Sequence, residues 1–191
     1  MPRKGLNHSQ VVEAAATLAD EVGLDQLTFA ALAKRLGISA PALYKHVDGL
    51  DQLRRDLTLL GLTELSARIR GAAVGKSRRD ALVAVAQGYR EFALDRPGLV
   101  NTVLRAPAAG DHEHEAAAAA TMNVLRQVLA GYELSEDDMI HAVRSLRVVM
   151  HGFTSLEAAG GFGLSQSLDE TYLRLVDALD QSLSSRRGGA R

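Results

Sequence analysis

The residue types best suited to chemistry in this chain of 191 residues lie between residues 26 and 47. Lys34, Arg35 and Lys45 are cations, His46 is neutral or cationic, and the segment contains no Asp or Glu. The whole chain has a net charge of −1, so these cations form a local patch in a near-neutral protein. Clustered cations of this kind bind the phosphate groups of nucleic acids. The alternative is the solvated face of two ordinary surface helices.

Two short helices around a tight turn would position these residues. Thr28 can accept a hydrogen bond from the first free N–H groups of a helix. Gly37 ends that helix, because glycine adopts the left-handed conformation without a Cβ clash. Ser39 caps the next helix, and Pro41 sits in its first turn, where the missing N–H costs nothing. A turn this short predicts a steep crossing, the geometry of a DNA-reading helix-turn-helix.

Composition narrows the class of protein. The chain has no cysteine, which excludes disulfides, thiolate zinc sites and cysteine nucleophiles. Its four prolines, its lack of tryptophan and its abundant alanine and leucine predict an all-α fold. No apolar run approaches about 18 residues, and residues 1–10 lack the apolar core of a signal peptide. We therefore expect a cytoplasmic protein that does not bind a membrane.

Apolar periodicity and capping residues predict the other helices. An amphipathic helix over residues 7–22, stopped by Gly23, completes a three-helix N-terminal unit. The later predicted helices cover residues 48–70, 77–95, 97–104, 111–131, 135–160 and 168–183.

The last two predicted helices differ from the others. From residue 139 to residue 164 only Arg144, Arg147 and Glu157 are charged, which predicts a helix buried on several sides. Residues 168–183 carry one clean apolar stripe. A hairpin of these helices can pair with a second copy in a four-helix bundle, or both can complete a monomer core. Selective DNA reading favours the dimer, because one recognition helix covers too little sequence.

Residues 6–65 resemble the DNA-binding domain of the TetR (tetracycline repressor) family. The resemblance rests on the helix over residues 11–22, the segment GLDQLT (23–28), the turn LGIS (36–39) and the run PALYKHV (41–47). A later run, from His151-Gly152-Phe153 to GGFG (160–163), resembles a C-terminal domain of one branch of the family. That branch is named for a Trp-His-Gly signature, whereas this chain has no tryptophan.

The resemblance implies a homodimeric transcriptional regulator with about nine helices, most relatives being repressors that ligand releases. The first three helices would bind double-stranded operator DNA, and the rest would hold a small-molecule pocket and the dimer bundle. The expected organisation is a helix-turn-helix domain over 1–47, a connecting helix over 48–70, a ligand-binding and dimerisation domain over 71–185, and a disordered tail over 186–191. No catalytic residue, metal or cofactor is expected.

The resemblance also assigns DNA contacts residue by residue. Tyr44 and His46 match positions that meet the DNA backbone or bases. Ala40, Pro41 and Ala42 start the recognition helix and would make apolar contacts in the major groove.

Two further residues would contact DNA by hydrogen bonding. Lys45 can donate to guanine or phosphate, and Thr28 can hold a phosphate with its hydroxyl and backbone N–H. One departure is Leu50, which stands where many relatives have a lysine that grips phosphate.

An apolar effector pocket is expected among the fourth to eighth helices. Its candidate lining residues are Tyr89, Phe92, Asn101, Arg105, Met122, Met150 and His151. The tetracycline repressor uses a histidine near its sixth helix for its magnesium-bound drug, but the matching residues 99–105 contain no histidine. Nothing therefore points to tetracycline as the effector.

Two other hypotheses stay open on sequence grounds. One is a small helical binding protein or enzyme with His151 in its cavity and no DNA binding, although the chain has no GxSxG, Gly-rich phosphate loop or HExxH. The other is metal binding at residues 111–115, where His112 and His114 point apart on a helix. An acidic helix start explains that cluster more simply.

Overall fold

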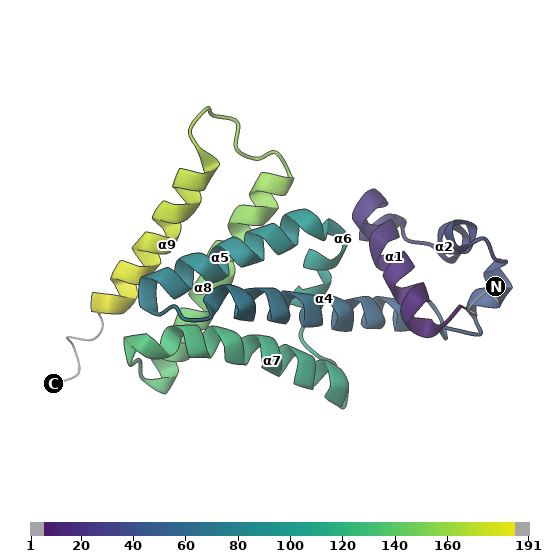
Figure 1. Ribbon diagram of the computed structural model, residues 1–191, viewed down its shortest axis with the longest axis horizontal. Coiled ribbons are helices and arrows are strands. Elements are labelled where there is room, and N and C mark those ends of the chain that lie inside the picture. The colour runs from purple at the N-terminus through teal and green to yellow at the C-terminus, as the bar shows by residue number, and fades with distance from the viewer. Residues whose placement is uncertain (1–5, 186–191) are drawn as a thin grey trace. The chain divides into compact units, whose positions relative to one another are not determined.

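The computed structural model describes residues 6–185, so the predicted tail over 186–191 lies outside the described residues. Within that range the chain forms nine α-helices and three short 3-10 helices without a strand, which confirms the all-α prediction (Figure 1). The α-helices are α1 (His8–Val22), α2 (Phe29–Leu36), α3 (Ala40–Leu43), α4 (Leu50–Ala73), α5 (Arg78–Asp95), α6 (Pro97–Val100), α7 (His112–Leu129), α8 (Glu136–Ala158) and α9 (Leu168–Ser185). The 3-10 helices are η1 (Leu24–Gln26), η2 (Thr102–Leu104) and η3 (Ala130–Tyr132).

Internal contacts divide the chain into two compact units. Of the described residues, the first unit joins 6–64 with Asp95–Ala118, and the second joins Leu65–Leu94 with 119–185. The first unit is therefore discontinuous in sequence, because the chain returns to it after α5.

Helix α1 begins where the sequence predicts. The Asn7 side chain accepts a hydrogen bond from the Gln10 N–H at 2.9 Å, and the Gln10 side chain accepts one from the Asn7 N–H at 3.0 Å. This reciprocal pair satisfies two backbone donors that a helix start leaves free. Gly23, with φ of +89°, ends the helix.

The return of the chain to the first unit depends on Gly98 of α6. A Cβ at this position would lie 2.4 Å from the carbonyl carbon of Ala19 in α1, so only glycine allows this approach. The Gly98 N–H donates to the Asp20 carboxylate at 2.9 Å. The neighbouring Arg96 lies within 3.4 Å of carboxylate oxygens of Asp20 and Glu13. A short segment is thereby bound to α1 by both shape and charge.

In the second unit, Arg90 of α5 joins the ends of α8 and α9. Its guanidinium donates to the Glu157 carboxylate at 2.5 and 2.8 Å and to Asp169 at 2.6 Å. The same guanidinium lies 5.6 Å from the ring centroid of Phe153 and 5.7 Å from that of Tyr172. Arg90 therefore fixes the α8–α9 hairpin, which Figure 1 shows as two helices joined by a long loop.

A second cluster holds the other end of α9. The Tyr132 hydroxyl donates to the Asp180 carboxylate, and Arg78 lies over the Tyr132 ring at 5.0 Å from its centroid. Arg78 also donates to the Gly131 carbonyl at 3.3 Å and to the Ser184 hydroxyl at 3.2 Å. Both ends of α9 are thus tied to α5 by an arginine.

The Gly98 contact predicts the stability of two alanine variants. Gly98→Ala should lower the free energy of unfolding by about 1–3 kcal/mol, because the new methyl group overlaps the α1 backbone. Gly71→Ala in α4 is the matched control, because a Cβ there meets no atom within 4 Å. It should be neutral or stabilising by up to about 1 kcal/mol. Urea unfolding followed by circular dichroism measures both, and equal midpoints for the two variants would contradict this packing.

Candidate nucleic-acid interface

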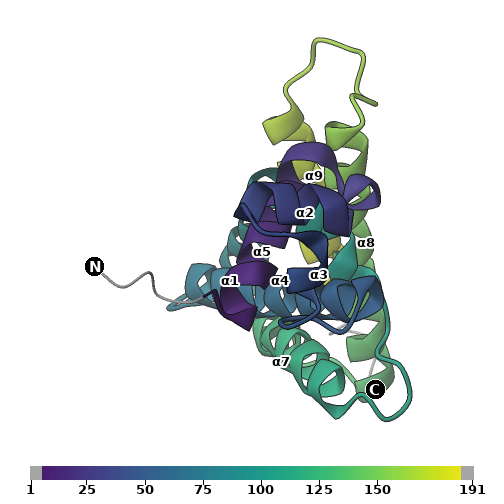
Figure 2. The same ribbon diagram turned by 90° about the vertical axis from the view of Figure 1, so that its right-hand side faces the viewer.

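The α2–turn–α3 segment forms as its sequence predicts. The Thr28 hydroxyl oxygen accepts a hydrogen bond from the Ala31 N–H at 3.2 Å and so caps α2. Gly37 ends α2 in the left-handed conformation, with φ of +68°. The next residue, Ile38, donates its N–H to the Ala33 carbonyl at 3.1 Å. The turn therefore closes back onto the last residues of α2. Helix α2 packs against both α1 and α3 (Figure 2).

Helix α3 is a single turn, extended by further hydrogen bonds. The N–H groups of His46 and Val47 donate to the Leu43 carbonyl at 2.8 and 3.0 Å. Leu43 is fully buried and Val47 is 3% exposed, so these two side chains anchor the segment in the core of the first unit. Ser39 occupies the N-cap position, but its side chain makes no capping hydrogen bond. The predicted cap is in this respect wrong, and burial rather than capping holds α3.

The predicted DNA-contacting residues lie on the outer side of this anchored segment. Tyr44 is 61% exposed, and its ring meets the edge of Phe29 at a centroid distance of 5.1 Å. Pro41, Lys45 and Thr28 are exposed as well, while Ala40, Ala42 and His46 are half-buried. Phe29 thus packs against a tyrosine that is mostly exposed to solvent.

One cation of the patch over residues 26–47, Arg35, is paired with a carboxylate that the sequence analysis does not include. Arg35 donates to both carboxylate oxygens of Glu21 in α1 at 2.6 and 2.7 Å. These hydrogen bonds lower the pKa of the Glu21 carboxyl. Lys34 and Lys45 are exposed and form no ion pair within the described residues. Glu21 lies outside the acid-free segment of residues 26–47, so the residues of that segment alone do not predict the Arg35–Glu21 ion pair.

The predicted effector residues are distributed over both compact units. In the second unit the Tyr89 hydroxyl lies 3.2 Å from His151 Nδ1, and the Ser155 hydroxyl lies 3.2 Å from His151 Nε2. Burial lowers the pKa of His151 and raises the pKa of Tyr89 to about 12. Burial thus favours the neutral form of the imidazole, which lies between two hydroxyls.

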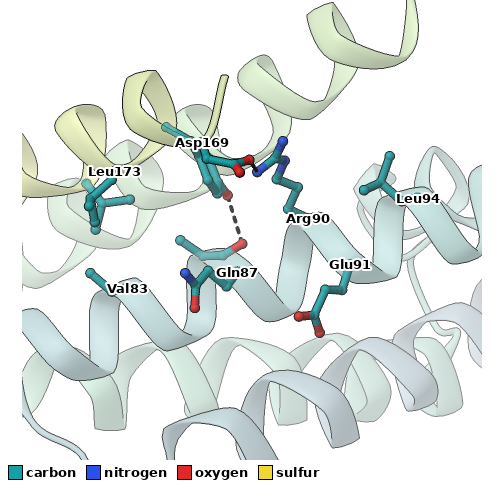
Figure 3. Close-up of a pocket in the computed structure, with 10 residues that line it drawn as sticks. Val83, Gln87, Arg90, Glu91, Leu94, Asp169 and Leu173 are labelled. Atoms are coloured by element: carbon teal, nitrogen blue, oxygen red, sulfur yellow. Dashed lines mark hydrogen bonds and ion pairs between the residues drawn. The ribbon is translucent and has the colours of Figure 1, made fainter. Parts of the chain in front are cut away.

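The other predicted effector residues differ in burial. Phe92 and Met150 are buried in the second unit, and Met122 is half-buried there. Asn101 and Arg105 are exposed and belong to the first unit. A cavity of about 360 Å³ lies elsewhere in the second unit, between α5 and α9, and none of the seven predicted residues lines it (Figure 3).

Residues 6–185 contain no group of three or more His, Cys, Asp or Glu side chains placed to hold a metal ion. No helix in this part of the chain is long and apolar enough to cross a membrane. At the start of α7, the Asp111 carboxylate instead accepts hydrogen bonds from Arg55 at 2.6 and 2.7 Å.

An exposed helix-turn-helix near the N-terminus, followed along the chain by further helices, is typical of DNA-binding regulators of the helix-turn-helix class. Comparison with known proteins gives the family. Residues 11–55 match the family model "Bacterial regulatory proteins, tetR family", and residues 82–179 match "Tetracyclin repressor-like, C-terminal domain". The chain belongs to the TetR family of transcriptional regulators. The finer assignment to the Trp-His-Gly branch stays a prediction.

Relatives and solved structures agree with this assignment. The chain is 33% identical to the HTH-type transcriptional regulator YobS of Bacillus subtilis (strain 168), over 89% of this chain and 88% of that protein. It is 34% identical to the HTH-type transcriptional regulator Rv0681 of Mycobacterium tuberculosis, over 81% and 72% of the two chains. A TetR variant from Acinetobacter baumannii AYE, solved in complex with minocycline, superimposes with a TM-score of 0.72 at 23% identity. That alignment covers 97% of this chain and all of the other.

Proposed function

We propose that this TetR-family regulator is a ligand-responsive repressor that binds a palindromic operator as a homodimer in the cytoplasm. A small apolar effector would release it from DNA. The observation that carries the proposal is the anchored and outward-facing segment around Tyr44, which lies in the acid-free segment of residues 26–47. Operator binding requires such a surface, because base edges and phosphates are reached only by exposed side chains.

The chemistry of the segment supports contacts with both phosphate and bases. Lys45 carries an exposed ammonium group that can donate to phosphate or to guanine. The Thr28 oxygen already accepts the Ala31 N–H, which leaves its hydroxyl proton to donate to a phosphate oxygen. Pro41 and the two alanines beside it present apolar groups that fit a thymine methyl.

Exposed apolar residues along α8 support the homodimer. Ile140, Val148 and Leu156 are 39%, 71% and 52% exposed, although the sequence predicts a helix buried on several sides. Leu175 of α9 is 41% exposed. In one chain α8 is buried on one side only, so a second copy packed on the α8–α9 hairpin would supply the missing cover. Two copies also present two recognition segments, which selective binding requires.

The pair formed by the buried Tyr89 and the half-buried His151 supports an effector site in the second unit. Phe92, Met122 and Met150 would supply apolar contacts there, and the pair would supply hydrogen bonds. Asn101 and Arg105 belong to the first unit, so their predicted role stays apart from this site. The minocycline complex of the A. baumannii protein shows that a neighbour of the same fold holds a small molecule.

Symmetry of the dimer predicts symmetry of the DNA. In vitro selection of duplex DNA by the purified full-length protein should recover palindromic sites with half-sites about one helical turn, roughly 10 base pairs, apart. A pool that contains only asymmetric sites without repeated half-sites would overturn the homodimeric part of the proposal.

The role of Lys45 is testable through the salt dependence of binding. Lys45→Ala should weaken binding of a selected duplex and reduce the slope of log K against log salt by at most about one, which corresponds to one lost phosphate contact. Lys76→Ala is the matched control, because Lys76 lies outside the helix-turn-helix and donates to the Ala72 carbonyl at 2.7 Å. Fluorescence anisotropy at several salt concentrations gives both slopes. Identical slopes for the wild type and Lys45→Ala would mean that Lys45 does not touch the DNA backbone.

A further inference from the structure

The cavity between α5 and α9 has two apolar walls. Val83 and Leu94 come from α5, and Leu173 and Val176 come from α9 (Figure 3). Leu94 is 58% exposed and Leu173 is 38% exposed, so both keep apolar surface that a ligand can cover. A volume of about 360 Å³ is at the small end of the range that small-molecule sites occupy.

The polar groups of the cavity give it a negative charge. Arg90 and Asp169 form an ion pair across the groove at 2.6 Å, as Figure 3 shows. Arg90 is already paired with the half-buried Glu157, and Glu91 also lines the cavity. Among the lining residues, the carboxylates of Glu91 and Asp169 accompany the one guanidinium of Arg90, which leaves the lining with a net charge of −1.

Two of the lining groups are free to bind a ligand. Glu91 forms no ion pair, and the Gln87 amide forms no hydrogen bond, within the described residues. Asp169 is 85% exposed and shares its arginine with Glu157, so it keeps acceptor capacity toward solvent. Arg90, by contrast, donates three hydrogen bonds to carboxylates and has little capacity left for an anionic ligand.

From this arrangement we propose that the α5–α9 groove binds a small amphipathic cation. Its ammonium group would lie near Glu91 and Asp169, and its hydrocarbon part would lie between the apolar walls. The site is separate from the predicted effector residues, and ligand binding at it does not depend on DNA.

Ligands that share one tail and differ in the head group test the charge preference. Octyltrimethylammonium, octanol and octanoate are titrated against the full-length protein by isothermal calorimetry without DNA. The ammonium compound should bind most tightly and octanoate least tightly, since a carboxylate is repelled by the acidic rim. Tighter binding of octanoate, or equal binding of octanol and the ammonium compound, would overturn the proposal, as would no binding of the ammonium compound.

Neutralising variants locate the site. Glu91→Gln and Asp169→Asn should each weaken binding of octyltrimethylammonium by about threefold, as expected for exposed charge pairs, and the double variant by about tenfold. Asp137→Asn, at the start of α8 and outside the cavity, is the matched control and should leave the affinity unchanged. Unchanged affinity in the double variant would overturn the assignment. Glu91→Gln should bind a selected duplex normally, so failure of this inference and failure of the DNA-binding proposal are distinguishable.

Discussion

The left-handed turn at Gly37 is the constraint on which the proposed DNA-binding surface depends. Helix α2 ends at this one residue, and the Ile38 N–H donates a hydrogen bond to the Ala33 carbonyl. Helix α3 has only four residues, too few to be stable without tertiary support. Burial of Leu43 provides that support, and the Phe29 ring provides it for Tyr44. Contacts with neighbouring residues, and not the stability of α3 itself, therefore hold the proposed recognition segment around Tyr44 in place.

A second constraint makes the DNA-binding unit discontinuous. Residues 95–118 belong to the same compact unit as α1, and Gly98 is the point of closest approach. Burial raises the pKa of the Asp20 carboxyl, while the Gly98 N–H and Arg96 oppose that shift. The chain therefore places a charged, partly buried contact where a segment far along the sequence meets the first helix. Arginines also join distant segments in the second unit, where Arg90 and Arg78 of α5 each donate a hydrogen bond to a residue of α9.

Local rules made most of the fold predictable from the sequence. Gly23, Thr28 and Gly37 define helix ends through interactions within four residues, and the structure confirms each of them. Interactions between distant residues were not predictable. Glu21 lies 14 residues from Arg35, and the charge reading of the helix-turn-helix missed their ion pair. The cavity between α5 and α9 was missed for the same reason, because its walls come from two helices that no periodic pattern connects.

The central claim is that the segment around Tyr44 enters a groove of the DNA. Fluorine resonances of labelled tyrosines test this claim most directly. The chain has four tyrosines, of which Tyr44 is 61% exposed and the other three are at most 5% exposed. Incorporation of 3-fluorotyrosine gives one fluorine resonance for each, and Tyr44→Phe assigns the exposed one. Addition of a selected duplex should shift the Tyr44 resonance most, and an unrelated duplex at the same salt concentration should shift it much less. A complex that leaves the Tyr44 resonance unchanged would contradict the account.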